Sequence, residues 1–158
     1  MEIELEDVTI LIVDDTPANI DVLREVLREH YSIKVATNGT RALEIVAGPA
    51  PPDLVLLDIM MPGIDGYEVC RRMKAAESTR PIPVIFVTAI DDIENEAKGF
   101  EAGCVDYIIK PVSEALILAR VAKHVRGSTR RSSASLRGTS GPWRNQHDKE
   151  ILSGSAQA

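Results

Sequence analysis

The chain has 158 residues, a length that suits one domain large enough to bury a core. Hydrophobic residues make up 44% and charged residues 27%, as in an ordinary globular protein, but aromatic residues only 4%, so Val, Ile, Leu and Ala must build the core. The net charge is −6, and residues 1–126 hold 22 Asp and Glu against 13 Lys and Arg, which argues against direct nucleic acid binding by the folded part.

The N-terminal segment MEIELEDV is acidic, whereas a secretory signal begins with basic residues before an apolar stretch. No apolar run approaches the roughly 20 residues that a membrane-spanning helix needs. We therefore expect a cytoplasmic protein without a membrane partner. Cys70 and Cys104 lack a paired spacing such as CxxC, so we expect two reduced thiols.

A pair of aspartates ends the first predicted strand. The apolar run Val8–Val13 predicts a buried strand, and Asp14 and Asp15 follow it directly. Pro17 then stands where a helix can begin, because proline is tolerated in a first helical turn. A core strand that ends in two adjacent negative charges makes these aspartates the first candidates for a chemical site.

Four more strand-and-helix units follow in the same alternation. The predicted strands are Ile33–Ala36, Asp53–Leu57, Val84–Val87 and Val105–Ile109. The predicted helices lie within 38–48, 60–75, Asp91–Glu101 and Ser113–Val125, with Gly48 and Gly103 as stop signals and Ser113 as a cap. The last three strands are followed by Asp58, Thr88 and Lys110, whose side chains can carry chemistry.

Strands that alternate with helices of about 10–15 residues predict an α/β fold with a parallel sheet and helices on both faces. Right-handed crossovers leave few topologies. We expect a flavodoxin-like, doubly wound, five-stranded sheet in the order 2-1-3-4-5. Its ligand site would lie at the carboxyl ends of the strands, where the strand order reverses between the first and third.

The composition changes at Gly127. The segment GSTRRSSASLRGTSGPWRNQ is rich in Ser, Gly, Thr and Arg and has no apolar periodicity, so it cannot bury enough surface to order itself. We expect one domain at residues 1–126 and a mostly disordered tail at residues 127–158. The three histidines, His30, His124 and His147, have no metal-ligand spacing and are expected at the surface.

The predicted topology brings the chemically active strand ends to one edge of the sheet. Asp14, Asp15, Asp58, Thr88 and Lys110 would then meet in one pocket. Three carboxylates repel one another unless a cation is present. Mg²⁺ prefers oxygen ligands and is commonly held by one or two carboxylates together with a phosphate. The third carboxylate could attack phosphorus and form an acyl phosphate, while the ammonium and the hydroxyl contact the transferred group.

Four motifs now identify a family. The segments ILIVDD, PDLVLLDIMMPGIDG, PVIFVTA and DYIIKP occur in this order between Glu6 and Val125. Together they resemble the receiver domain of two-component response regulators, similar to the chemotaxis response regulator.

The resemblance implies a role for single residues. Asp58 would be the phosphoacceptor, and Asp14 and Asp15 the acidic pair that binds Mg²⁺ together with Asp58 and the backbone carbonyl of Met60. Thr88 would be the switch hydroxyl, Tyr107 the aromatic switch residue and Lys110 the phosphate-binding lysine. The Lys110–Pro111 bond matches the site of a cis peptide in the family.

The implied function is a signalling switch rather than an enzyme with turnover. A sensor histidine kinase or a histidine phosphotransfer protein would supply the phosphoryl group, and the face built from the fourth helix, fifth strand and fifth helix would change shape, with homodimerisation through that face as an option. Met60 and Ile90 are apolar where they would flank an attacking water, so we expect slow autodephosphorylation.

Alternatives remain at this point. The chain resembles the receiver of larger regulators in which a similar last helix leads into a cyclic-dinucleotide output enzyme. A haloacid-dehalogenase-like phosphatase also uses an aspartyl nucleophile, but it would have a DxD motif where this chain has DDTP. A degenerate receiver that acts only as a scaffold would not need the complete set of pocket residues.

Overall fold

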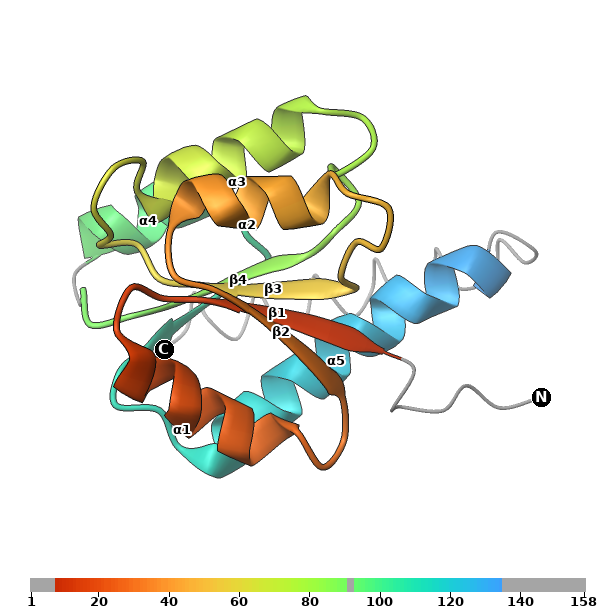
Figure 1. Ribbon diagram of the computed structural model, residues 1–158, viewed down its shortest axis with the longest axis horizontal. Helices are drawn as coiled ribbons and strands as arrows, with labels where there is room; N and C mark the ends of the chain where they lie inside the picture. The colour runs from red at the N-terminus through yellow and green to blue at the C-terminus, as the bar shows by residue number, and fades with distance from the viewer. Residues whose placement is uncertain (1–7, 91–92, 135–158) are drawn as a thin grey trace. The chain divides into compact units, whose positions relative to one another are not determined.

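The computed structural model of the protein describes residues 8–90 and 93–134, in which five strands alternate with five helices (Figure 1). The strands are β1 (Thr9–Val13), β2 (Ser32–Ala36), β3 (Leu54–Leu57), β4 (Val84–Thr88) and β5 (Asp106–Ile109). The helices are α1 (Pro17–Leu27), α2 (Gly39–Val46), α3 (Gly66–Ala75), α4 (Ile93–Ala102) and α5 (Glu114–Ala134).

All strand pairs are parallel, and the sheet has the order β2-β1-β3-β4-β5, as predicted. In the register, Val13 lies beside Ala36 on one side and beside Leu57 on the other. The strands on either side of the reversal therefore end level with each other. This confirms the flavodoxin-like α/β fold and fixes the edge at which the strand-end residues meet.

The pleat of the sheet divides the core into two halves. Leu11 and Val13 of β1 belong to the half that packs against α2, α3 and α4. Ile10 and Ile12 belong to the half that packs against α1 and α5. Figure 1 shows the same arrangement, with α2, α3 and α4 on one side of the sheet and α1 and α5 on the other. Because the three central strands, β1, β3 and β4, are covered on both faces, their residues form nearly continuous apolar runs rather than an alternating pattern.

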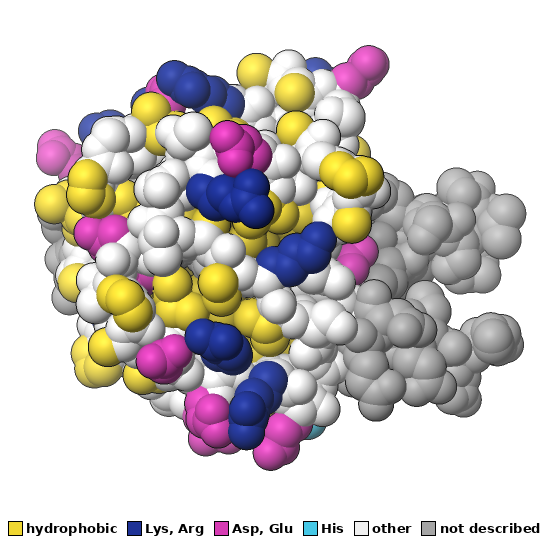
Figure 2. Space-filling view, viewed as in Figure 1, with side chains coloured by type: hydrophobic (Ala, Val, Ile, Leu, Met, Phe, Trp, Pro, Cys, Tyr) yellow, Lys and Arg dark blue, Asp and Glu magenta, His cyan; other side chains and the backbone are white. Residues whose placement is uncertain are grey.

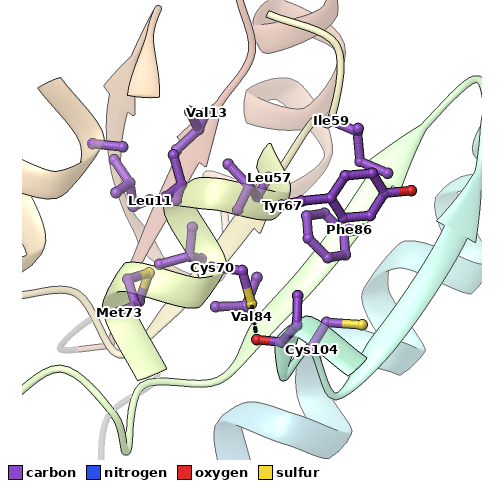
Figure 3. Packing of buried hydrophobic residues seen from close by; sticks show 14 of the residues in the cluster. Leu11, Val13, Leu57, Ile59, Tyr67, Cys70, Met73, Val84, Phe86 and Cys104 are labelled. Carbon is purple, nitrogen blue, oxygen red and sulfur yellow. Dashed lines mark hydrogen bonds between the residues drawn. The ribbon is translucent and has the colours of Figure 1, made fainter. Parts of the chain in front are cut away.

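Among the described residues, the half of the core under α2, α3 and α4 holds three of the four buried aromatic side chains, and Figure 3 shows part of it. Phe86 of β4 is fully buried and lies between the rings of Tyr67 and Tyr107. The two cysteines are in the same half, and the Sγ of Cys70 contacts the carbonyl of Ala102 at 3.4 Å. The remaining volume is filled by aliphatic side chains, as the low aromatic content requires.

Helix starts follow local rules. The side chains of Asn38, Asp65 and Ser113 accept hydrogen bonds from backbone N–H groups three residues later, at 2.8, 2.9 and 2.9 Å. Pro17 opens α1, as predicted. Gly103 follows α4 with a φ of +111°, a conformation that favours glycine, so it acts as the expected stop.

The last helix is longer than predicted. The sequence predicted its end at Val125, but α5 continues to Ala134, so the start of the proposed tail is helical. Apolar periodicity reports only where the buried face ends, whereas an existing helix gains one backbone hydrogen bond for each added residue. The rest of the proposed tail, residues 135–158, lies outside the described residues. The chain divides into two compact units, Met1–Ser128 and Thr129–Ala158, and all five strands belong to the first.

The surface in Figure 2 shows basic side chains lying beside acidic ones. Among the described residues, ion pairs form within single helices, for example Arg41 with Glu44 at 3.1 Å and Arg72 with Glu68 at 2.8 Å. These side chains are largely exposed, so each pair contributes little to stability. Among the described helices, none has the length and apolar character needed to cross a membrane.

Candidate functional site

Three carboxylates meet at the carboxyl edge of the sheet, as the topology predicted. Oxygens of Asp14, Asp15 and Asp58 lie within 4.8 Å of one another. Asp14 and Asp58 are buried, with 1% and 8% of their surface exposed, and Asp15 is exposed. Backbone hydrogen bonds extend the strand ladder into the site, since the N–H of Asp14 donates to Ala36 and that of Asp58 to Val13, at 3.1 and 2.9 Å. The sheet itself therefore fixes the two buried aspartates.

Both carboxylate oxygens of Asp14 are occupied. Its Oδ1 accepts hydrogen bonds from the backbone N–H of Thr16 at 2.9 Å and from the side-chain amide of Asn19 at 3.4 Å. Its Oδ2 accepts from the ammonium of Lys110 at 2.8 Å. The residues that orient this carboxylate come from the loop after β1, the start of α1 and the end of β5.

Asp58 is held more loosely on one side. Its Oδ1 accepts a hydrogen bond from the N–H of Ile59 at 2.7 Å, while its Oδ2 lies 3.4 Å from the ammonium of Lys110. Burial raises the pKa of Asp58 above its ordinary value, and the charge of Asp14 adds to the rise, although Lys110 and hydrogen bonding to Thr88 and Ile59 oppose it. The single positive charge of Lys110 therefore does not fully compensate the negative charge of the Asp58 carboxylate.

Lys110 joins the strand ends, as predicted. Its backbone N–H donates to the carbonyl of Thr88 at 2.8 Å, which places the lysine beside the end of β4. Its side chain is 20% exposed and reaches both Asp14 and Asp58. The ammonium therefore bridges the two buried carboxylates.

The predicted switch residues share one partner, Ile90. Thr88 is fully buried, and its Oγ1 accepts a hydrogen bond from the N–H of Ile90 at 3.4 Å. Tyr107 is 6% exposed, and its hydroxyl donates to the carbonyl of Ile90 at 3.1 Å. A rotation of either hydroxyl therefore acts on the same stretch of backbone.

Met60 and the predicted cis peptide complete the list of expected features. The side chain of Met60 is 66% exposed, so it does not fill the pocket. The Lys110–Pro111 bond is cis, as the resemblance implied. Ile90 is half-buried and packs against the core under α4.

The donor set fits Mg²⁺. Three carboxylates and one ammonium leave a formal excess of two negative charges among the described groups. All the acidic ligands are hard oxygens, which suit Mg²⁺ better than a thiophilic metal. Asp14, Asp15 and Asp58 are therefore the residues that could hold the ion.

Two clusters of polar contacts outside the carboxylate pocket were not predicted. Asp106 at the start of β5 bonds Arg120 at 2.5 Å and His124 at 3.2 Å, so His124 is paired and largely buried rather than a free surface residue. Tyr67 of α3 contacts Asn95 of α4 through its hydroxyl. The four-residue spacing of Arg120 and His124 puts both side chains on one helix face, but this signal does not identify Asp106 as their partner.

Comparison with known proteins now adds the family. The model of the response regulator receiver domain matches residues 10–122. A probable cyclic di-GMP phosphodiesterase of Vibrio cholerae is 50% identical over 123 residues, which are 78% of this chain and 28% of that protein. The response regulator PleD of Caulobacter vibrioides is 42% identical over 113 residues, which are 71% of this chain and 25% of that protein. The chain thus spans about a quarter of the length of these relatives.

Solved structures agree in fold. A putative response regulator from Chloroflexus aurantiacus has a TM-score of 0.71 and 36% identity, covering 75% of this chain and 97% of that one. The BeF3-activated receiver domain of Klebsiella pneumoniae RstA has a TM-score of 0.68 and 36% identity, covering 75% and 98%. The chain belongs to the response regulator receiver domain family, whose members are signalling switches that are phosphorylated by histidine kinases and bind Mg²⁺ at an acidic pocket.

Proposed function

We propose that this receiver domain is switched by a phosphoryl group on Asp58. The observation that carries the proposal is the difference between the two buried aspartates. Both carboxylate oxygens of Asp14 accept hydrogen bonds, at 2.9 and 2.8 Å, whereas Oδ2 of Asp58 lies 3.4 Å from the ammonium of Lys110. Asp15 is exposed and outside the core. Asp58 therefore combines a fixed position with the oxygen most available for attack.

The transfer would proceed by attack of Asp58 on the phosphorus of a phosphohistidine. A P–O bond forms, the P–N bond breaks, and its electron pair leaves with the imidazole, which is neutral when its other nitrogen carries the proton. Lys110 would contact the transferred group as a point charge. Asp14, Asp15, Asp58 and the carbonyl of Met60 would hold Mg²⁺, which when bound offsets the charge of the nucleophile and the phosphoryl oxygens.

The switch would act through Ile90. A phosphoryl group adds about −1.5 to −2 charges and strong acceptors beside Thr88. A Thr88 hydroxyl that turns to donate to this group changes its contact with the N–H of Ile90, whose carbonyl holds Tyr107. Tyr107 is already buried in this structure, so we expect phosphorylation to change the population of this inward position rather than to create it.

The direct test uses a small phosphodonor. Wild type and Asp58→Asn would be incubated with acetyl phosphate and Mg²⁺, and the intact mass measured. Asp53→Asn is a matched control, because Asp53 lies at the other end of β3 and bonds the N–H of Thr9 at 2.8 Å. We expect one phosphoryl group on wild type and on the control, and none on Asp58→Asn. Equal labelling of all three proteins would refute the assignment.

The partner would be a sensor histidine kinase or a histidine phosphotransfer protein. Homodimerisation through the α4-β5-α5 face is supported by three exposed apolar side chains, Phe100 on α4, Val105 directly before β5 and Leu116 on α5, which are 47%, 39% and 36% exposed. Sedimentation with and without phosphodonor tests it, and a monomer under both conditions would contradict it. The expected cytoplasmic location and the expected lack of nucleic acid binding stay predictions.

A second candidate concerns the output. The 50% identity to a probable cyclic di-GMP phosphodiesterase, of which the chain matches 28%, favours a receiver that controls a cyclic-dinucleotide enzyme. Fusing residues 1–134 to the remainder of that relative tests this idea. We expect the hydrolysis rate to depend on acetyl phosphate in the fusion and not in its Asp58→Asn variant. The phosphatase alternative is not supported, because the receiver model covers the whole predicted site.

A further inference from the structure

Three aromatic rings form a row across the sheet under α4. The ring of Tyr67, on α3, meets that of Phe86 edge-on, with centroids 5.6 Å apart and an interplanar angle of 65°. The ring of Phe86, on β4, lies 6.1 Å from that of Tyr107, on β5. Figure 3 shows the rings of Tyr67 and Phe86 beside each other. We call Tyr67, Phe86 and Tyr107 the aromatic row.

The outer end of the row binds the start of α4. The hydroxyl of Tyr67 lies 3.0 Å from the backbone carbonyl of Asn95 and 3.0 Å from its side-chain oxygen. The ammonium of Lys98 lies over the same ring, 5.0 Å from its centroid. A residue of α3 thus holds α4 by a hydrogen bond and by a cation–π contact.

Helix α4 also packs closely on the inner part of the row. A Cβ added to Gly99 would lie 3.1 Å from the ring of Phe86 and 3.1 Å from that of Tyr107. This is closer than ordinary packing allows, so the helix backbone rests directly on the two rings. Asn95, Lys98 and Gly99 lie on one face of α4, at a spacing of three and four residues. This face follows the row from Tyr67 to Tyr107.

Tyr67 and Tyr107 therefore stabilise the same packing of α4 against the aromatic row. An outward rotation of Tyr107 would separate its ring from Phe86 and from the backbone at Gly99, and it would release the carbonyl of Ile90. Tyr67 opposes this change from the far side, because it keeps α4 and Phe86 in place.

We propose that Tyr67 is a positioning residue of the switch, which sets the population of the inward position of Tyr107 through Asn95 and Phe86. This rests on the switch role of Tyr107 given under Proposed function. In this proposal Tyr67, and with it helix α3, joins Tyr107 among the parts of the molecule that respond to the phosphorylation state.

Fluorine NMR on fluorotyrosine-labelled protein tests the role of Tyr67, because the chain has three tyrosines and single Tyr→Phe variants assign the signals. Tyr67→Phe keeps the ring and removes the hydroxyl. We expect its Tyr107 signal to shift or broaden, and the amides of α4 to exchange about five-fold faster, the equivalent of about 1 kcal/mol. Tyr31→Phe, a buried tyrosine in the other half of the core, should leave both readouts at wild-type values.

Asn95→Ala removes the side-chain oxygen and keeps the backbone carbonyl, so it should give a smaller change in the same direction. A Tyr67→Phe protein whose Tyr107 signal and α4 exchange equal those of wild type overturns the proposal, even when its melting temperature falls. Acetyl phosphate labelling of the same samples separates the hypotheses. Wild type without a label contradicts the proposed function, whereas normal labelling with an unchanged Tyr107 signal contradicts only the role of Tyr67.

Discussion

Replacing Lys110 by methionine should destabilise the protein in a way that Mg²⁺ corrects. The ammonium lies 2.8 Å from an oxygen of Asp14 and 3.4 Å from one of Asp58, and the three side chains are 20%, 2% and 10% exposed. Removing one partner of a buried ion pair costs about 3–5 kcal/mol. Some of this is recovered because Asp58, whose pKa burial already raises, can take up a proton. We therefore expect a loss of about 2–4 kcal/mol in the free energy of unfolding without metal.

Urea unfolding with and without saturating Mg²⁺ measures this effect. A bound divalent ion supplies the missing positive charge, so the loss in Lys110→Met should shrink to less than half when Mg²⁺ is present. Lys34→Met is the matched control, because the ammonium of Lys34 donates to a backbone carbonyl, that of Ala50, at 2.6 Å. The same loss with and without Mg²⁺, or a loss no larger than that of the control, would refute the charge argument for the pocket.

Three further predictions concern pH, thiol reactivity and dephosphorylation. Burial opposes the charge of Asp106, but hydrogen bonds from its partners on α5 lower its pKa below the ordinary value of 3.8. The carboxylate of Asp106 therefore stabilises the fold at pH values above 3.8, and Asp106→Asn should lower the free energy of unfolding there by about 2 kcal/mol. This difference should vanish as the pH falls through the folded-state pKa of Asp106. A difference in urea midpoints that does not depend on pH would contradict this. Burial raises the pKa of Cys70 to about 11 and that of Cys104 to about 12, so iodoacetamide at pH 8 should label the native protein slowly and the urea-unfolded protein fully, as read by intact mass. Met60→Gln supplies a side chain that can orient an attacking water, so the phosphorylated variant should lose its phosphoryl group several-fold faster than the phosphorylated wild type. Loss of the phosphoryl group from wild type within seconds would show that the apolar Met60 does not slow dephosphorylation.

The sequence predicted those parts of the fold and site that depend on chain direction alone. The ends of parallel strands meet at one edge, so Asp14, Asp58 and Lys110 could be placed together from the strand pattern. Glycine and capping signals placed most helix ends within a few residues, because they act locally. The predicted end of the last helix, at Val125, was wrong because a helix can continue beyond the point where its apolar face ends.

The residues that the sequence analysis missed make contacts between different elements. Tyr67 and Asn95 are 28 positions apart, and nothing in the periodicity of α3 or α4 shows that their polar ends meet. The contact between Asp106 and His124 is equally hard to predict, since each residue alone resembles a surface residue. Such contacts depend on how far one helix slides along its neighbour, which is determined by packing and not by sequence spacing.

The sheet separates two aliphatic and aromatic interiors that share no side chains. Substitutions beneath α1 and α5, such as those at Leu23 or Val121, can change how strongly the protein resists unfolding without touching the rings beneath α4. Substitutions in the half beneath α1 and α5 can therefore change the free energy of unfolding during evolution while the residues that respond to a signal, beneath α4, stay the same.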